Sequence, residues 1–296
     1  MTRLIPILFV LLWSTGFIGA KYGLPFAEPF TFLSLRLSIA AGLLALVVIL
    51  MKRPWPKPEQ LKHIAFSGLL IHAGYLGGVF WAIKHGMPAG VAALITGLQP
   101  IVTAVFARLF LKEDSSLQQW LGLVLGLVGM STVVITRMQG THLDVTPATL
   151  ISALIALFAI SFGTIYQKRY VKQMPVLAGT FVQYASSSLI LGILAFSLEN
   201  RQISWQPEFI FALSWLIIVL SFGAVMLLMV LIERNAAAKT GSLFYLVPLA
   251  TALEAYLLFG EHLSWLAYLG MFLAIIGVAL VVSPKFKIFR RLSPSS

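Results

Sequence analysis

The stretch "PIVTAVFARLFLKEDSSLQQWLGLVLGLVG", residues 100–129, has an ungapped counterpart in "PLATALEAYLLFGEHLSWLAYLGMFLAIIG", residues 248–277. Self-similarity at a fixed offset indicates an internal duplication, and the sequence therefore predicts two copies of one structural unit. A shift of 148 positions superimposes Pro100 on Pro248, Thr103 on Thr251, Ala104 on Ala252, Glu113 on Glu261, Gly122 on Gly270 and Gly129 on Gly277.

The duplication extends to the start of the chain. A shift of 147 positions aligns "STGFIGAK" at residues 14–21 with "SFGTIYQK" at residues 161–168, and the two share Ser, Gly and Lys at equal spacing. The first apolar segment follows Arg3 and ends in small residues, which is also typical of a secretory signal peptide. Because it has a counterpart in the second half, we expect this segment to be retained.

Composition decides which solvent surrounds the two copies. The 296 residues are 59% hydrophobic and 10% charged, with a mean hydropathy of +0.94, whereas soluble domains carry about 25% charged residues. Apolar runs of about 20 residues suit helices that cross a bilayer core about 30 Å thick, while membrane strands would give shorter alternating runs. We predict an all-α membrane protein with ten transmembrane helices, at residues 4–22, 30–51, 61–83, 89–111, 117–135, 147–167, 176–198, 209–232, 239–259 and 265–282.

The 21 lysine and arginine residues indicate how these spans are oriented. With a cytoplasmic N-terminus, sixteen of them fall in or next to cytoplasmic segments and four in or next to outer segments, and only Arg36 lies deep within a span. The positive-inside rule then places both termini in the cytoplasm. Topology and anionic lipid headgroups explain the net charge of +11. A nucleic-acid surface is excluded, because the basic residues do not form a stripe interleaved with aromatic residues.

Five spans in each copy make the second copy cross the membrane in the opposite sense to the first. We predict a first repeat at residues 1–144 and an inverted second repeat, with a short basic cytoplasmic tail, at residues 145–296. Many secondary transporters use inverted repeats to alternate access to a site near the bilayer midplane. The chain has no cysteine, which excludes disulfides and cysteine-bound metals but indicates no compartment.

The spans, the run "LRLSIAAGLL" in the second of them, and the paired patterns "P…FLKE…GLVLGLVG" and "P…LFGE…GMFLAIIG" resemble the EamA-type branch of the drug/metabolite transporter superfamily. The resemblance covers nearly the whole chain. It implies a carrier in the inner (cytoplasmic) membrane, often an exporter, for amino acids, related metabolites or drugs. Two positions depart from the family pattern: Lys112 stands where glycine is usual, and Glu254 stands where an apolar residue is usual.

Glu254 lies inside the ninth span, and its repeat counterpart is Phe106, so the fold itself does not require an acid there. A charge at the bilayer centre costs about 2.5–3.5 kcal/mol, and less toward the interface. One interpretation is a glutamate that reaches an outward-facing vestibule or is held neutral by burial. The other is a group that handles protons or substrate. Arg36, at a similar depth in the second span, is the partner expected for a buried ion pair.

Arg36 and Gln183 are repeat counterparts in the second and seventh spans. Arg36 either ties helix backbones together or holds a substrate carboxylate in its guanidinium fork. In the fourth span, Thr96, Gln99 and Thr103 recur at spacings of three and four residues, which predicts one helical face. These side chains would line a cavity or hydrogen-bond a neighbouring helix, and Pro100 within the same stretch would free a backbone carbonyl.

His72 lies in the third span, with Tyr75 one turn later. Because histidine changes charge near neutral pH, His72 and Glu254 are the candidates for proton coupling. The alternative is that His72 is a satisfied core residue. Aromatic side chains could line a pocket for an apolar substrate or serve helix packing and the interfacial belts: Trp13, Tyr75, Trp81, Tyr166, Tyr184 and Tyr245.

Other features are interpreted as structural. Glu113 and Glu261 close matching hairpins, and "SSLQ" at residues 115–118 fits a capping box for the fifth span. Gly122, Gly126 and Gly129 predict a small-residue face that lets two helices approach closely.

An intramembrane enzyme would need a nucleophile with a base, paired aspartates or a metal cluster. Neither aspartate falls in a span and the histidines lack ligand spacing, so we predict no enzyme, no metal and no cofactor. We predict a secondary transporter that exports amino acids or related amphipathic metabolites by alternating access, with protons as the candidate coupling ion. A multidrug or organic-cation efflux carrier, a channel and a non-transporting scaffold are the alternatives.

Overall fold

The chain folds into helices joined by short loops. The computed structural model describes residues 4–87, 89–137, 145–235, 237–250, 253–254 and 264–283. The helices of the first half are α1 (Ile5–Gly23), α2 (Pro29–Leu50), α3 (Pro58–Gly68), η1 (Leu69–Gly74), α4 (Tyr75–Lys84), α5 (Ala89–Thr96), α6 (Gln99–Phe106), η2 (Ala107–Leu111) and α7 (Leu117–Arg137). Those of the second half are α8 (Pro147–Tyr170), α9 (Val176–Leu198), α10 (Pro207–Trp215), η3 (Leu216–Ala224), α11 (Val225–Arg234), α12 (Ala237–Ser242), η4 (Leu243–Leu246) and α14 (Trp265–Val282).

The expected all-α membrane architecture is confirmed for the described residues. Two shorter apolar helices, Ile5–Gly16 and Gln99–Leu111, accompany the long ones. Within the described ranges, seven helical segments are long and apolar enough to cross a bilayer: Pro29–Leu50, Pro58–Lys84, Leu117–Thr136, Pro147–Tyr170, Val176–Leu198, Pro207–Arg234 and Trp265–Val282.

The fourth and ninth predicted spans differ from continuous helices. In the fourth, α5 ends at Thr96 and α6 begins at Gln99, with Pro100 in its first turn. Thr96 therefore lies on α5 while Gln99 and Thr103 lie on α6, so the three residues do not share one regular helix as their spacing predicted, and the chain breaks where Pro100 was expected to free a carbonyl. The physical reason is that proline lacks an N–H and is accommodated best in a first turn, where no such donor is needed. The ninth begins with α12 and the 3₁₀ turn η4, and residues 251–252 and 255–263, which include Thr251 and Glu261, lie outside the described residues.

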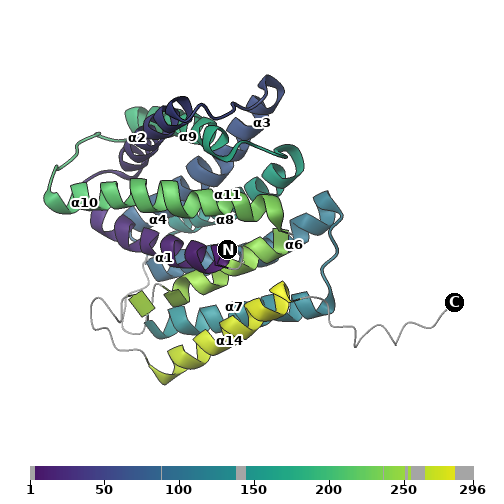
Figure 1. Cartoon of the computed structure of the whole chain (residues 1–296). Helices are drawn as coiled ribbons and strands as arrows, with labels where there is room; N and C mark the ends of the chain where they lie inside the picture. The colour runs from purple at the N-terminus through teal and green to yellow at the C-terminus, as the bar shows by residue number, and fades with distance from the viewer. Residues whose placement is uncertain are drawn as a thin grey trace.

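The first helix of each half packs against the other half. Helix α8 lies on α4, η1 and α6, whereas α1 lies on α10, η3 and α11. Two further pairs flank this arrangement, α2 with α9 and α7 with α14, and Figure 1 shows them on opposite sides of the molecule. The two halves are therefore interleaved rather than separate.

The predicted small-residue face on α7 is confirmed, and it contacts α14. A Cβ atom added to Gly122 would lie 2.6 Å from the carbonyl oxygen of Gly277, and one added to Gly129 would lie 2.5 Å from that of Gly270. These distances leave no room for a side chain, so glycine sets the separation of the two helices.

The predicted capping box lies one residue later than expected. Ser116 N–H donates to Gln119 Oε1 (2.8 Å) and Gln119 N–H donates to Ser116 Oγ (3.3 Å). Placing it at residues 115–118 was wrong, because either serine could supply the hydroxyl and the structure uses the second. Glu113 forms an ion pair with Lys168 at 2.9 Å, in agreement with its structural interpretation.

Two π-helical segments interrupt the third and eighth spans. They are η1 and η3, which start at Leu69 and Leu216, 147 positions apart. A π-helical turn is wider than an α-helical turn and is frequent at functional sites. His72 lies in η1 and Ser221 lies in η3.

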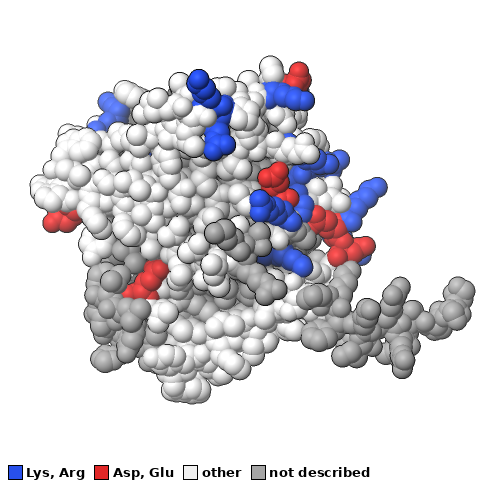
Figure 2. Space-filling view, in the orientation of Figure 1, with Lys and Arg blue, Asp and Glu red and all other residues white. Residues whose placement is uncertain are grey.

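Charged side chains avoid the middle of the face seen in Figure 2. Most of those visible gather on the right of the view, where α11 ends, and a broad uncharged area covers the helices. Large apolar side chains such as Leu50 (72% exposed) and Phe196 (75% exposed) lie on the outside. An exposed apolar surface of this kind suits contact with lipid.

Candidate functional site

Arg36 on α2 is buried with an incomplete set of partners. Its side chain is 1% exposed, Nε donates to Ser221 Oγ at 3.3 Å, and Nη1 has no hydrogen-bond partner in the described structure. None of the ion pairs between described residues involves it. An uncompensated buried charge costs several kcal/mol. The Arg36 guanidinium therefore has no counter-charge among the described residues.

Tyr184 and His72 complete what we call the Arg36 cluster, which consists of Arg36, His72, Tyr184 and Ser221. The Tyr184 hydroxyl on α9 donates to the carbonyl oxygen of Ser221 at 2.8 Å. The His72 ring meets the Tyr184 ring edge to face, with 4.9 Å between centroids. His72 is 1% exposed, and its side chain interacts with that of Gln183. The cluster thus joins α2, η1, α9 and η3.

Gln183, the repeat counterpart of Arg36, makes mainly structural contacts. Its Nε2 donates to Ser67 Oγ (2.9 Å) and to Gln167 Oε1 (2.8 Å), which links α9 to α3 and α8. Gly68 permits this approach, because a Cβ atom there would lie 2.6 Å from Gln183 Cα. The Gln183 side chain also interacts with His72 of the Arg36 cluster.

Glu254 pairs with a serine and not with Arg36. Ser14 Oγ on α1 donates to Glu254 Oε1 at 2.5 Å, and Glu254 Oε2 has no described partner. The predicted ion pair with Arg36 is therefore wrong for this conformation, since Arg36 is directed at Ser221 on η3. The repeat counterparts of Ser14 and Glu254 are Ser161, whose buried hydroxyl lacks a described partner, and Phe106.

Four aromatic rings, Phe9, Trp13, Tyr75 and Phe244, form an aromatic cluster. The Trp13 ring stacks on Tyr75 with 6.5 Å between centroids and meets Phe244 edge to face at 5.3 Å, and Phe9 contacts both Trp13 and Phe244 at 5.3 Å. Trp13 directly precedes Ser14, and Tyr75 lies one turn after His72. The aromatic cluster therefore includes rings from α1, which also carries Ser14, and from α4, which directly follows the η1 segment of His72.

The remaining candidates lie around α6. Thr96 Oγ1 donates to the carbonyl oxygen of Ala92 at 2.8 Å, so its own helix satisfies it. Gln99 Nε2 and Thr103 Oγ1 are buried without a described partner, and Thr103 faces Gly241 on α12. Tyr245 packs its ring on Gly126 of α7, and its hydroxyl also lacks a described partner. This set lies on α5, α6 and η4, and the residues of the Arg36 cluster lie on other elements.

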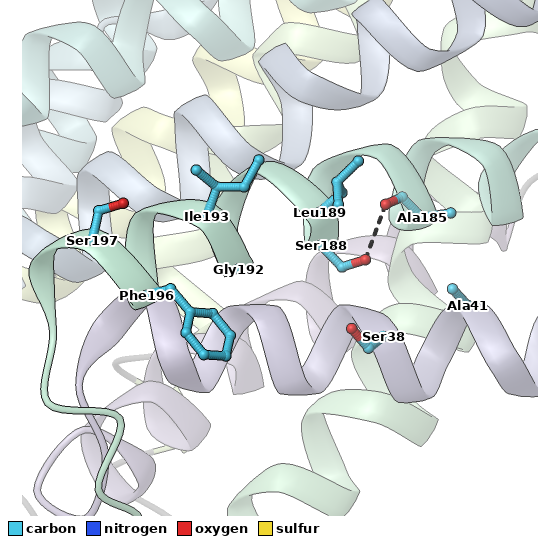
Figure 3. Close-up of a pocket in the computed structure, with 9 residues that line it drawn as sticks. All are labelled: Ser38, Ala41, Ala185, Ser188, Leu189, Gly192, Ile193, Phe196 and Ser197. Atoms are coloured by element: carbon cyan, nitrogen blue, oxygen red, sulfur yellow. Dashed lines mark hydrogen bonds between the residues drawn. The ribbon is translucent and has the colours of Figure 1, made fainter.

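The open hollows of the structure lie elsewhere. One of about 750 Å³ lies between α2 and α9, and Figure 3 shows its lining, where Ser188 Oγ donates to the carbonyl oxygen of Ala185 at 3.0 Å. Another of about 530 Å³ lies beside α8 and is lined by apolar side chains such as Phe106 and Phe158. Neither contains a predicted site residue, and exposed side chains such as Phe196 indicate that the first faces lipid. The Arg36 cluster is closed in this conformation.

The sequence model of the EamA-like transporter family matches the chain twice, over residues 3–135 and over residues 147–283. The chain belongs to the EamA-like transporter family. It is a membrane transporter, and the resemblance inferred from the repeated patterns is confirmed.

Similar proteins agree with this assignment. The uncharacterized inner membrane transporter YedA of Escherichia coli (strain K12) is 27% identical over 279 residues, 93% of this EamA-like chain and 89% of YedA. The probable amino-acid metabolite efflux pump of Salmonella typhimurium (strain LT2) is 25% identical over 289 residues, 94% of this chain and 93% of the pump. A solved crystal structure at 19% identity aligns with a TM-score of 0.76 over 94% of this chain and 96% of its own, which shows a shared fold.

Sequence reasoning missed several residues of the site of this EamA-like transporter. Ser221 was not singled out because nothing local marks a π-helical segment. Phe9 and Phe244 lie within uniformly apolar runs, where no pattern distinguishes one phenylalanine from another. The repeat gave the one usable signal for Ser14, which aligns with Ser161. Of the aromatic candidates, Trp81 stacks on His85 and Tyr166 binds His63 at 2.7 Å, so both pack near helix ends and not in the site.

Proposed function

We propose that this EamA-like transporter is a secondary carrier that exports amino acids or related small amphipathic metabolites across the inner membrane by alternating access. The observation that carries the proposal is the buried Arg36 guanidinium, whose Nη1 lacks a described partner and which has no ion-pair partner among the described residues. A guanidinium fork binds a carboxylate through two parallel hydrogen bonds. A substrate carboxylate would supply the counter-charge that the fold omits.

Glu254 and the aromatic cluster suit the remaining groups of an amino acid, its ammonium and its side chain. Glu254 presents a carboxyl oxygen without a described partner, which a substrate ammonium would satisfy. The aromatic cluster would contact an apolar side chain of the substrate. His72 and Gln183, whose side chains interact with each other, would supply further polar contacts. Gln99, Thr103 and Tyr245 would line the opposite wall once the pocket opens.

The proposed architecture has ten spans in two inverted halves, residues 1–144 and 145–296, with both termini cytoplasmic. Several observations support it. The family description matches each half separately. The π-helical segments η1 and η3 start 147 positions apart. A shift of 148 positions also converts the contact of Gly122 with Gly277 into that of Gly270 with Gly129, as a two-fold axis between α7 and α14 requires.

Proton exchange is the proposed coupling. Glu254 accepts from Ser14 through one oxygen while the other is left without a described partner, so the group can hold a proton when no substrate ammonium is present. His72 is the second candidate because imidazole exchanges protons near neutral pH. Glu254→Gln would then transport with little dependence on a pH gradient, and a variant that keeps the full dependence would exclude Glu254 from coupling.

Efflux of organic cations is the second candidate function. Two features favour it, the carboxyl of Glu254, which contacts Ser14, and the rings around Trp13, the residue before Ser14. Cations bind to carboxylates and to aromatic faces. A cation would use this end and leave Arg36 without a counter-charge. For this reason we prefer an amphipathic substrate with both charges. The name of the Salmonella relative, an amino-acid metabolite efflux pump, points the same way.

Counterflow in proteoliposomes tests the proposal. Vesicles are loaded with unlabelled amino acids, carboxylates or cationic drugs, and uptake of the labelled compound is followed. We expect transient accumulation of an amino acid by wild type, and a loss of at least about tenfold in Arg36→Lys, which keeps the charge but not the fork. Accumulation of cations alone, unaffected by Arg36→Lys, would support the second candidate. Absence of any flux would favour a scaffold.

A further inference from the structure

Two groups of helices meet at the Arg36 cluster. The first group consists of α8 together with α4, η1, α6 and η2, which pack on it. The second group consists of α1 together with α10, η3 and α11, which pack on it. His72 belongs to the first group and Ser221 to the second. Access to the cluster from either side of the membrane therefore requires these groups to separate at one end.

Lys84 joins the two groups at one end. It is the last residue of α4, and its Nζ donates to the carbonyl oxygen of Leu24, the C-cap of α1, at 3.1 Å. The same Nζ lies 3.6 Å from Glu28 Oε1. An ammonium at a helix C-terminus binds the terminal carbonyl groups and opposes the negative end of the helix dipole. We call this contact the outer clasp, since Lys84 falls in a predicted outer segment.

Lys168 joins the same two groups at the other end. It lies in the last turn of α8, and its Nζ donates to the carbonyl oxygen of Asn235, the C-cap of α11. Glu113, which follows η2, holds the same ammonium at 2.9 Å. We call this contact the inner clasp, since Lys168 falls in a predicted cytoplasmic segment. Helices α8 and α11 are the repeat counterparts of α1 and α4, so the two clasps join corresponding pairs of helices.

We infer that the two lysine clasps are the alternating closures of the carrier: the outer clasp must open while the inner clasp holds, and the reverse. This inference rests on the alternating-access carrier proposed above. Both clasps are formed in the present conformation, and the Arg36 cluster is closed. Each clasp couples a lysine to a carbonyl oxygen at a helix end, and the lysine side chains are 28% and 21% exposed. Water can therefore replace the bond when the helices part.

Arg169 offers a matched control beside Lys168. Its Nη1 donates to the carbonyl oxygen of Phe110 at 2.7 Å. Phe110 lies in η2, so this bond stays within the first group. Loss of Arg169 removes a charge-assisted bond at the same end of the molecule without releasing the second group.

The experiment uses the absence of native cysteine. Ser221→Cys in the Arg36 cluster and, separately, Ser161→Cys on α8 introduce a single buried thiol. Labelling by a membrane-impermeant thiosulfonate is measured in intact cells and in inverted vesicles, for Lys84→Met, Lys168→Met and Arg169→Met. Monodisperse elution of each purified variant establishes that it is folded.

We expect Lys84→Met to raise labelling from the outside about fivefold, as loss of roughly 1 kcal/mol from one closure would, without raising it from the cytoplasmic side. Lys168→Met should give the reverse pattern. Arg169→Met should match the parent, and Lys84→Arg and Lys168→Arg should restore it. Equal changes on both sides, or none at either reporter, would overturn the inference.

Labelling needs no substrate, so the two proposals fail separately. Opposite shifts in labelling without amino-acid counterflow would refute the substrate and leave the clasps in place. Counterflow with unshifted labelling would refute the clasps and leave the carrier in place.

Discussion

Ser14→Ala tests the environment of Glu254 with a control that the repeat provides. The substitution removes the hydroxyl that donates to Glu254 Oε1 at 2.5 Å. A hydrogen bond to a charged group contributes about 1.5–3 kcal/mol. Because Glu254 is only partly buried and the Ser14 hydroxyl also lies 2.7 Å from the carbonyl oxygen of Leu11, we expect a loss of about 1–2 kcal/mol. Ser161→Ala removes an equally buried hydroxyl that has no described partner.

Thermal unfolding of the purified variants in one detergent measures the difference. A loss of about 1–2 kcal/mol corresponds to a fall in Tm of about 2–6 °C for a chain of this size. Ser161→Ala should remain within about 1 °C of wild type, or rise slightly, since it loses no bond. Equal shifts for the two variants would refute the reasoning, because the hydroxyls would then contribute through packing alone.

Three further substitutions test the α7–α14 contact, the cap of α2 and the role of His72. Gly129→Leu should abolish the monodisperse size-exclusion peak, because its Cβ would lie 2.5 Å from the carbonyl oxygen of Gly270. Gly42→Leu should elute like wild type, because nothing lies within 4 Å of that position. A monodisperse Gly129→Leu beside an aggregated Gly42→Leu would contradict the α7–α14 contact. Glu199→Ala should lower Tm by about 3–8 °C, since its carboxylate accepts three bonds of 2.7 Å from Phe30 N–H, Thr31 N–H and Thr31 Oγ1; a Tm unchanged from wild type would show that the cap is not formed. His72→Gln should retain folding but reduce counterflow more than His85→Gln, because His85 stacks on Trp81 near the end of α4, outside the site; equal activity of the two would exclude His72.

The sequence predicts the long elements well because hydrophobic length dominates them. The predicted spans at 176–198 and 265–282 have the bounds of α9 and α14. The close contact of α7 with α14 also follows from its glycines, since few other residues permit it. Pro100 was expected to disturb the helix near Thr96, but the division into α5 and α6 could not be predicted, because Pro100 is compatible with either a kinked helix or a new first turn.

Partner choice within the site could not be predicted from the sequence. Arg36 and Glu254 have complementary charges, yet the former bonds Ser221 and the latter Ser14. Two residues at the same depth in different spans can point in different directions around their helices. Equal depth therefore does not identify a partner. The π-helical segments shift that direction locally, and single-sequence patterns carry no signal for them.

Binding of a substrate carboxylate by Arg36 is tested most directly by comparing an amino acid with its amide. Ligand-induced thermal shifts are measured on wild type and on Arg36→Met, for an amino acid found to show counterflow and for the corresponding amide, which lacks the carboxylate. We predict stabilisation of wild type by the acid and not by the amide, with neither ligand stabilising Arg36→Met. Equal stabilisation by acid and amide, or stabilisation that persists in Arg36→Met, would contradict the account.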